Sequence, residues 1–375
     1  PPPPCFFFPL KPASAILIGL VGSEMCIRDR AKQLNIDGIC SFGCDPGVVT
    51  AAYVAEKLGL PGAGPYESVC ILQNKGRFRK FLTENGFNVP TAKSYSNVEQ
   101  AIAEADKFHW PIIVKPTDSA GSKGVTKVEC RKDLEVSIKN ALEYSHCKEF
   151  IIEDFIRQKG FSSDSECFSV DGNLALVSFS SQRFDAKAIN PYTPAAFSWP
   201  SQLSKAHQEE LQREIQRLIS LLNMKTSIYN VESRVGYDGK AYIMEVSPRG
   251  GGNRLAECIR FATGIDLIEN TVRAAVGFPL LEMGKPEYTD IWAEVILHSN
   301  ASGFFRDLII SEEIKPFIRE VDLWVKPGEP VQSFQGANTT IGTVILCFNC
   351  EKTMEHYIGS PAEYLTVRIQ EKVKE

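Results

Sequence analysis

Residues 228–254 read IYNVESRVGYDGKAYIMEVSPRGGGNR and predict a β-hairpin that runs into a glycine-rich turn. Apolar and polar residues alternate on both arms, and Asp238-Gly239 between the arms is the strongest short-range hairpin signal. With these two residues as the loop, Glu232 lies directly opposite Glu245, with Cβ atoms roughly 4.5–5.5 Å apart. Because like charges in that position are destabilising, the hairpin predicts a bound cation.

The face of the hairpin that holds these glutamates has the features of a ligand site. The apolar residues are expected on the other face, against the core: Tyr229, Val231, Val235, Tyr242, Met244 and Val246. Carboxylate oxygens suit Mg²⁺ or Mn²⁺, usually alongside substrate phosphates. Arg249 and the run Gly250–Gly252 follow at once and offer a planar donor and free backbone N–H groups to an anion. A surface hairpin with solvated glutamates is the alternative, but the register, the arginine and the glycines favour the site.

Length and composition indicate a globular protein of two or three lobes in the cytoplasm. The 375 residues are 43% hydrophobic and 23% charged, with a formal net charge of −5, and no apolar run reaches the length of a membrane span. The mildly acidic chain lacks a basic stripe for nucleic acid. Eleven irregularly spaced cysteines are typical of reduced thiols inside the cell. We therefore expect neither nucleic acid nor a membrane as a partner.

Residues 1–30 do not match the rest of the chain, and we interpret them as an artefactual or foreign segment. A proline run precedes a short apolar stretch; a signal peptide is the alternative, which the proline run and the cysteine usage disfavour. Residues 31–72 resemble half of an α/β domain, with a buried strand expected at 36–42 and a helix at 46–60. Because the opening strand and first glycine turn are missing, this domain is expected to be truncated.

Two lysines and a glycine–serine loop predict a phosphate site. Residues 74–85 read as a helix that begins near Lys75, and Lys115 ends a strand that leads into a flexible loop. The loop positions free to approach phosphate oxygens are Ser119, Gly121, Ser122 and Gly124. Neither of the common glycine-rich phosphate motifs is present, so the loop alone fits an ordinary hairpin connection equally well. A lysine directly before it favours phosphate.

The remaining segments predict alternating strands and helices. Residues 149–156 read EFIIEDFI, a strand too apolar to be exposed, and a second hairpin turns at Asp171-Gly172, with Asp164 and Glu166 at its entry. Residues 184–203 combine prolines and aromatic residues without periodicity, and we interpret them as a substrate lid. Helices are also expected at 133–145, along the stripe Leu211, Ile215, Leu218 and Leu222, and on both sides of Gly264; strands dominate 286–375.

The order and spacing of these motifs resemble the ATP-grasp superfamily. The motifs are the strand with Lys115 and its loop, the EDFI strand, and Glu232 paired with Glu245 before Ser247-Pro-Arg249. The resemblance covers about residues 73–277 and is strongest to the carbamoyl-phosphate-synthase-like and amino-acid-ligase branches. It implies an α/β (α+β) fold with a truncated α/β domain at 31–72, an ATP-grasp domain at 73–285 and a strand-rich C-terminal domain at 286–375.

The resemblance also implies how ATP is bound. Lys75 and Lys115 would contact its phosphates, with residues 119–124 closing over them as a mobile lid. The hinge strand would hold adenine through Glu153, Asp154, Phe155 and Ile156. Ribose would be bound by Asp164 or by Glu166.

The metal and the catalytic residues follow from the same resemblance. Glu232 and Glu245 would hold Mg²⁺ or Mn²⁺, and Ser247, where the family usually has asparagine, would be a weaker third ligand. Whether the site holds one metal ion or two therefore stays open. Arg249 would stabilise the transferred phosphoryl group or the carboxylate, together with Lys115 and with Arg254 as a helper.

The implied activity is an ATP-dependent ligase that joins a small carboxylate to an amine through an acyl phosphate. Bicarbonate activation, as in carboxylases and carbamoyl-phosphate enzymes, is a second hypothesis. A nucleotide-binding module without turnover is a third. The sequence does not identify the acid or the amine, and it leaves the oligomeric state open, with a homodimer as one option.

Overall fold

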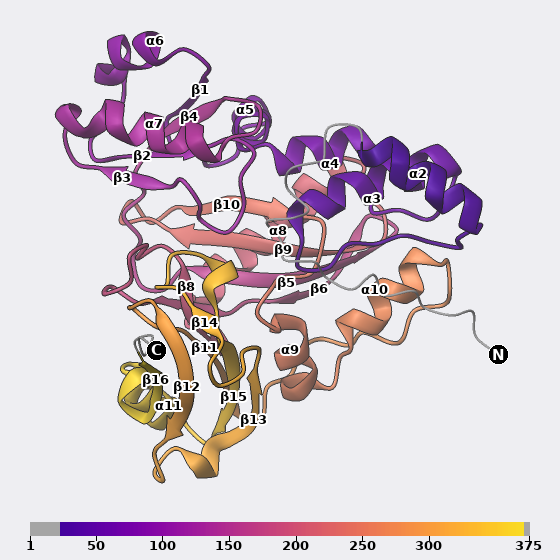
Figure 1. Ribbon diagram of the computed structural model, residues 1–375. Coiled ribbons are helices and arrows are strands. Elements are labelled where there is room, and N and C mark those ends of the chain that lie inside the picture. The colour runs from indigo at the N-terminus through magenta and orange to yellow at the C-terminus, as the bar shows by residue number, and fades with distance from the viewer. Residues whose placement is uncertain (1–22, 371–375) are drawn as a thin grey trace.

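The computed structural model describes residues 23–370, and these begin with three helices (Figure 1). They are α2 (Ser23–Leu34), α3 (Asp45–Leu58) and α4 (Tyr66–Gln73). As predicted, α3 has a proline in its first turn and ends at Gly59, which adopts the left-handed φ of 66°. The strand expected at 36–42 is wrong. Phe42 makes only an isolated bridge to Gly250, because no neighbouring strand among the described residues pairs with this segment.

The segment interpreted as artefactual lies mostly outside the described residues. Helix α2 passes without a break through the expected boundary between residues 30 and 31 and packs on α3. The domain division at this point therefore stays a prediction.

A small lobe follows, built on an antiparallel sheet with strand order β1-β4-β2-β3 (Figure 1). Its strands are β1 (Ala92–Tyr95), β2 (Ile112–Pro116), β3 (Thr126–Val128) and β4 (Phe150–Asp154). Its helical elements are α5 (Lys75–Glu84), α6 (Val98–Ala103), η1 (Ala105–Lys107), η2 (Arg131–Asp133) and α7 (Leu134–Tyr144). The strands and helices around Lys75 and Lys115 thus form where the sequence predicts them.

The central sheet lies beneath the small lobe in Figure 1 and has the strand order β10-β9-β5-β6. Its strands are β5 (Ser163–Val170), β6 (Asn173–Ser178), β9 (Ser227–Val235) and β10 (Ala241–Ser247). Helix α8 (Lys205–Leu221) packs against it, and the predicted apolar stripe of α8 is buried in the core. The second hairpin turns at Asp171-Gly172 as expected, since Val170 pairs with Asn173.

A third sheet, of order β13-β15-β11-β8-β7, packs below the central one. Its strands are β7 (Ser181–Phe184), β8 (Pro194–Trp199), β11 (Ile291–Leu297), β13 (Ile318–Leu323) and β15 (Gly342–Phe348). The lid expected at 184–203 is therefore wrong in extent: alternate apolar residues of β8 enter the core, and this strand separates the loop 185–193 from the short connection 200–203. Because β8 pairs with β11, this sheet also crosses the expected boundary at 285/286.

The rest of the C-terminal region completes the fold. A small sheet of order β14-β12-β16 joins β12 (Gly303–Ile310), β14 (Pro330–Val331) and β16 (Leu365–Gln370). The helical elements are α9 (Leu255–Thr263), α10 (Leu267–Ala275), η3 (Lys315–Phe317), η4 (Ala337–Thr339), α11 (Glu351–Ile358) and α12 (Pro361–Tyr364). Every sheet of the described residues is antiparallel, so the fold is α+β. Within residues 23–370, no helix is both long and apolar enough to cross a membrane.

The β9–β10 hairpin has the predicted register at its glutamates but a different turn. Glu232 faces Glu245, whereas nearer the turn Ser233 faces Ile243, one residue out of that register. The loop is one residue longer than an Asp-Gly loop, and a β-bulge at Met244 restores the register. The prediction that Tyr242 and Met244 cover the core is consequently wrong.

Beyond the bulge the two faces of β10 are exchanged. Ala241 and Ile243 enter the core, while Tyr242 donates a hydrogen bond to Asp238 Oδ2 at 2.6 Å. A one-residue shift moves every side chain to the other face of a sheet, which explains the exchange.

Candidate active site

Polar side chains form two rows across the central sheet, on the face opposite the core that α8 covers. In the first row Glu245, Glu232 and Asp164 lie opposite one another on β10, β9 and β5. In the second row Ser247, Asn230 and Glu166 do the same. Asn230 joins the rows, since its Nδ2 donates to Asp164 Oδ1 at 2.6 Å and to Glu166 Oε1 at 2.9 Å. These two rows, called the acidic rows below, therefore place four carboxylates on one face of the sheet. The sequence analysis paired only two of them, Glu232 and Glu245.

The carboxylates differ in their electrostatic surroundings. Burial, reinforced by the Glu232 carboxylate, raises the pKa of Asp164 to about 7, and burial raises the pKa of Glu166 to about 8. Burial also opposes ionisation of Glu232, but Arg234, whose Nη2 lies 2.7 Å from Glu232 Oε1, keeps the pKa of Glu232 below its usual value. The ribose role predicted for Asp164 and Glu166 stays a prediction, since both accept hydrogen bonds from Asn230 within the rows.

The two predicted lysines lie at the small-lobe side of this face. Lys75, in the first turn of α5, has its Nζ 3.3 Å from Glu245 Oε2 and donates to Ser119 O at 2.8 Å. Lys115 is buried, with its Nζ 2.7 Å from Glu153 Oε2. Lys75 thus connects the glutamate pair to the glycine–serine loop, as a phosphate ligand would need to.

The glycine–serine loop lies across the site toward the C-terminal region. Gly121, Ser122 and Gly124 have left-handed φ angles of 67°, 60° and 70°. Ser122 O accepts from Asn190 Nδ2 at 2.9 Å, and the same Nδ2 donates to Gln335 O at 3.3 Å. The loop therefore contacts the 185–193 connection, although its movement as a lid stays a prediction.

The hinge strand presents its residues on two sides. Asp154, Phe155 and Ile156 line a cleft that Tyr237 and Tyr242 close from the hairpin. Asp154 is held by His109, whose N and Nδ1 lie 2.8 Å from its two carboxylate oxygens.

Glu153 points away from that cleft and lies between two buried cations. Its Oε1 is 2.8 Å from Arg79 Nε, opposite the contact with Lys115. Arg79 Nη2 also donates to Met244 O at 2.8 Å, which anchors the β-bulge to α5. The sequence offers no signal for this role of Arg79, because an arginine in an amphipathic helix is usually solvated.

Arg249 pairs with a residue that the sequence analysis missed. Its Nε donates to Asp45 Oδ1 at 2.9 Å, and its Nη2 lies 2.6 Å from the same oxygen. Ser247 Oγ donates to Asp45 Oδ1 at 2.7 Å and accepts from Gln73 Nε2 at 2.7 Å. Asp45 begins α3, so the N-terminal lobe positions both Ser247, the last residue of β10, and Arg249, which follows it.

The glycine run is packed tightly where it meets the acidic rows. Gly251 N donates to Glu166 Oε1 at 2.9 Å. A Cβ at Gly251 would lie 2.6 Å from that oxygen, 2.6 Å from Leu255 Cδ1 and 2.8 Å from Asn230 Nδ2, whereas a Cβ at Gly252 would meet nothing within 4 Å. The absence of a side chain at residue 251 therefore permits the close approach.

Gly251→Ala is accordingly expected to destabilise the protein by about 1–3 kcal/mol, the usual cost of overpacking, and to impair any turnover. Urea unfolding and ADP formation measure the two effects. Gly252→Ala is the matched control and should change neither. Equal stability and activity in the two variants would contradict the packing described for Gly251.

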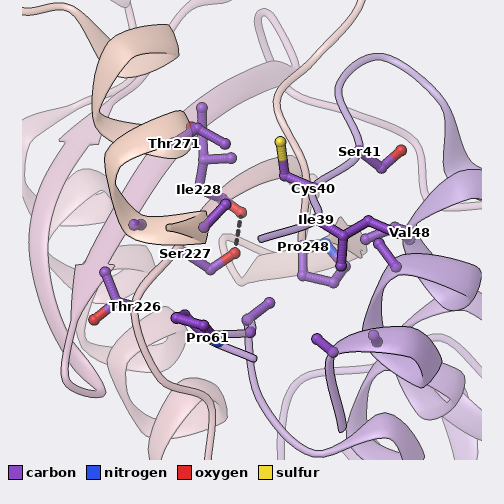
Figure 2. A pocket seen from close by; sticks show the side chains of 17 residues that line it. Ile39, Cys40, Ser41, Val48, Pro61, Thr226, Ser227, Ile228, Pro248 and Thr271 are labelled. Atoms are coloured by element: carbon purple, nitrogen blue, oxygen red, sulfur yellow. Dashed lines mark hydrogen bonds between the residues drawn. The ribbon is translucent and has the colours of Figure 1, made fainter. Parts of the chain in front are cut away.

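A separate small pocket lies behind the glycine run, between α3, the start of β9 and α10 (Figure 2). Its walls include Ile39, Val48, Ile228 and Pro248, with Ser227 Oγ donating to Ile228 O at 2.9 Å. No charged side chain lines it, so it lacks the groups of the acidic rows.

The site thus combines a small lobe, whose lysines and glycine–serine loop face the larger antiparallel sheet, with paired carboxylates on that sheet. Residues 108–257 match the family model described as the ATP-grasp domain, in agreement with the resemblance that the sequence motifs indicate.

Solved structures agree on the fold. The L-amino acid ligase from Bacillus licheniformis aligns with a TM-score of 0.77 and 21% identity over 95% of this chain and 86% of its own. The biotin carboxylase domain of 2-oxoglutarate carboxylase from Hydrogenobacter thermophilus, in complex with MgADP, ADP and bicarbonate, aligns with a TM-score of 0.68 and 15% identity, over 93% and 78%.

Among curated proteins, the carbamoyl phosphate synthase large chain of Neisseria meningitidis serogroup B is 25% identical over 218 residues, 58% of this chain. The match spans only 20% of the length of that relative.

Proposed function

We propose that the chain is an ATP- and Mg²⁺-dependent carboxylate–amine ligase. Such an enzyme transfers the γ-phosphoryl group of ATP to a substrate carboxylate, and an amine then displaces phosphate from the acyl phosphate. The observation that carries the proposal is the direct opposition of Glu232 and Glu245, with Lys75 Nζ 3.3 Å from Glu245. Paired carboxylates beside a phosphate-binding lysine suit a metal–phosphate complex.

The residues present fit one Mg²⁺ better than two. Within residues 23–370 no group of three or more His, Cys, Asp or Glu side chains is placed to hold a metal ion. Mg²⁺ is commonly held by one or two carboxylates with substrate phosphates supplying the other ligands, which matches Glu232 and Glu245. Ser247 fits less well, since its hydroxyl is already engaged by Asp45 and Gln73. When bound, Mg²⁺ would neutralise charge on the phosphates.

The chain's own residues have distinct roles in this proposal. Lys75 and the 119–124 loop bind and cover the phosphates, and Lys115 supports the hinge through Glu153 while reaching the nucleotide. Arg249, oriented by Asp45, binds the carboxylate that accepts the phosphoryl group. Positioning and electrostatic stabilisation of this kind account for most of the catalysis of phosphoryl transfer.

A screen of ADP and phosphate release tests the proposal on the full chain. Amino acids, small diacids and bicarbonate are supplied with ATP and Mg²⁺, each with and without an amine. Release that requires both an acid and an amine supports the ligase. Release with bicarbonate alone supports bicarbonate activation instead, and ATP binding without any release identifies a non-catalytic module.

Asp45→Asn tests the positioning of Arg249. The variant removes the charge that holds Nε and Nη2, so we expect kcat to fall by about 10–100-fold while ATP affinity is unchanged. Steady-state ADP formation and nucleotide titration measure the two quantities. Asp37→Asn, an exposed position in the same lobe, is the control. An unchanged kcat in Asp45→Asn would show that Arg249 does not depend on Asp45.

A further inference from the structure

Glu294 in β11 is fully buried, with 0% of its surface exposed, and neither carboxylate oxygen has a hydrogen-bond partner. It lies on the same face of β11 as Trp292 and Ile296, which belong to the core cluster between the third sheet and α9. A buried carboxylate without partners disfavours folding, so packing alone gives no reason for a glutamate here.

This carboxylate faces the same side of the central sheet as the acidic rows. Phe168 and Ile228 continue those rows along β5 and β9, two residues beyond Glu166 and Asn230, and both belong to the same core cluster as Trp292 and Ile296. The charge of Asp164 acts on Glu294, which agrees with that placement. Glu294 therefore lies at the end of the candidate active site that is remote from the small lobe.

The surroundings of Glu294 are strongly acidic. Arg254 is the cation that acts on it, and the Arg254 guanidinium is already shared among three carboxylates. These are Glu257 at 3.4 Å, Glu320 at 2.8 Å and Asp322 at 3.6 Å. Glu294 is a fourth carboxylate around one arginine, and burial raises its pKa well above the usual value. A positively charged ligand group would offset this imbalance.

The backbone of Asn253 and Arg254, next to this acidic group, is strained. Asn253 and Arg254 have left-handed φ angles of 54° and 67°, an uncommon conformation for residues other than glycine. They connect the glycine run, which follows Arg249, to α9 (Leu255–Thr263).

We propose that Glu294 binds a cationic group, an ammonium or a guanidinium, on the substrate whose carboxylate is activated beside Arg249. The inference rests on the proposed ligase function and narrows its substrate class to acids that contain a positive charge. Two unpartnered carboxylate oxygens accept hydrogen bonds from such a group, and ion pairing compensates the buried charge of Glu294.

Binding of isosteric ligand pairs tests the proposal without requiring turnover. The protein, loaded with Mg²⁺ and a non-hydrolysable ATP analogue, is titrated with arginine against citrulline, which differ in charge at the side chain, and with norleucine against hexanoate, which differ in the α-ammonium. We expect the wild type to bind the member with the additional positive charge about tenfold more tightly in at least one pair. Glu294→Gln should lose that preference, keep its affinity for the ATP analogue and resist urea at least as well as the wild type. Glu287→Gln, an exposed change in the segment before β11, should behave as the wild type.

Equal binding within both pairs by the wild type, or no binding of any charged probe, would overturn the proposal, as would a preference that survives in Glu294→Gln. A gain in stability without any change in preference would indicate a merely structural residue. Failure of the ligase proposal gives a different result, because ADP release would then be absent in the wild type even where charged ligands bind.

Discussion

Glu153→Gln is expected to lower the free energy of unfolding by about 3–5 kcal/mol, the cost of removing one partner from a buried ion pair. Within residues 23–370, Glu153 is the only carboxylate within ion-pair distance of Arg79 and Lys115, which are 3% and 9% exposed. Without it, two buried cations would face each other at the junction of α5, the hinge strand and the β-bulge. Urea unfolding at neutral pH measures the loss.

The pH dependence of stability gives a second test at the same residue. Burial opposes ionisation of Glu153, but Arg79 and Lys115 outweigh it and hold the pKa at about 2 instead of the usual 4.5. Since the folded pKa is the lower one, the stabilisation is complete above the usual value and is lost as the pH falls toward 2. The difference in stability between wild type and Glu153→Gln should therefore shrink over this range.

Glu84→Gln is the control for both measurements. Glu84 lies on the surface of α5, where its ion pair with Lys80 spans 3.8 Å, and such pairs contribute well under about 1 kcal/mol. A change no larger in Glu153→Gln than in Glu84→Gln would contradict the role assigned to the buried cluster.

Glu245→Gln is expected to reduce Mg²⁺-dependent ADP formation by at least about 100-fold. The variant keeps the shape of the side chain but removes one of the two opposed carboxylates and the partner of Lys75. Its stability without metal should change little, because repulsion from Glu232 and attraction to Lys75 are lost together. ADP formation as a function of Mg²⁺ concentration and urea unfolding separate these effects.

The matched control for this variant is Glu209→Gln, an exposed position on α8. Retention of full Mg²⁺-dependent turnover by Glu245→Gln would refute the assignment of Glu245 to the metal. A parallel loss in the control would indicate a general defect instead.

The pairing of Glu232 with Glu245 could be predicted from the sequence, although the predicted turn was wrong. An Asp-Gly loop of two residues and a regular ladder give the same register at the glutamates as the three-residue loop with a bulge at Met244. The bulge depends on Arg79, which binds the carbonyl of Met244 from α5, and no local pattern in β10 specifies it. The residues between turn and bulge were therefore assigned to the wrong faces.

Local patterns also explain why the lid was misread. The segment 194–199 pairs with β7 across the 185–193 connection, which is too long for a tight turn, and its pairing with β11 joins residues about a hundred positions apart. Prolines and aromatic residues suggested a loop, whereas tertiary pairing and burial of Phe197 and Trp199 make it a strand in the core.

The sequence by itself determined several of the helices, the two hairpins and the opposition of two glutamates beside a glycine run, because each depends on residues close together in the chain. Only the tertiary structure decided which side chains complete the site. Asp45 reaches Arg249 across 204 positions, and Glu294 comes about 50 to 130 residues after the strands that form the acidic rows. Contacts of this kind depend on how separate elements pack, and alternation along a single strand or helix contains no information about its partner.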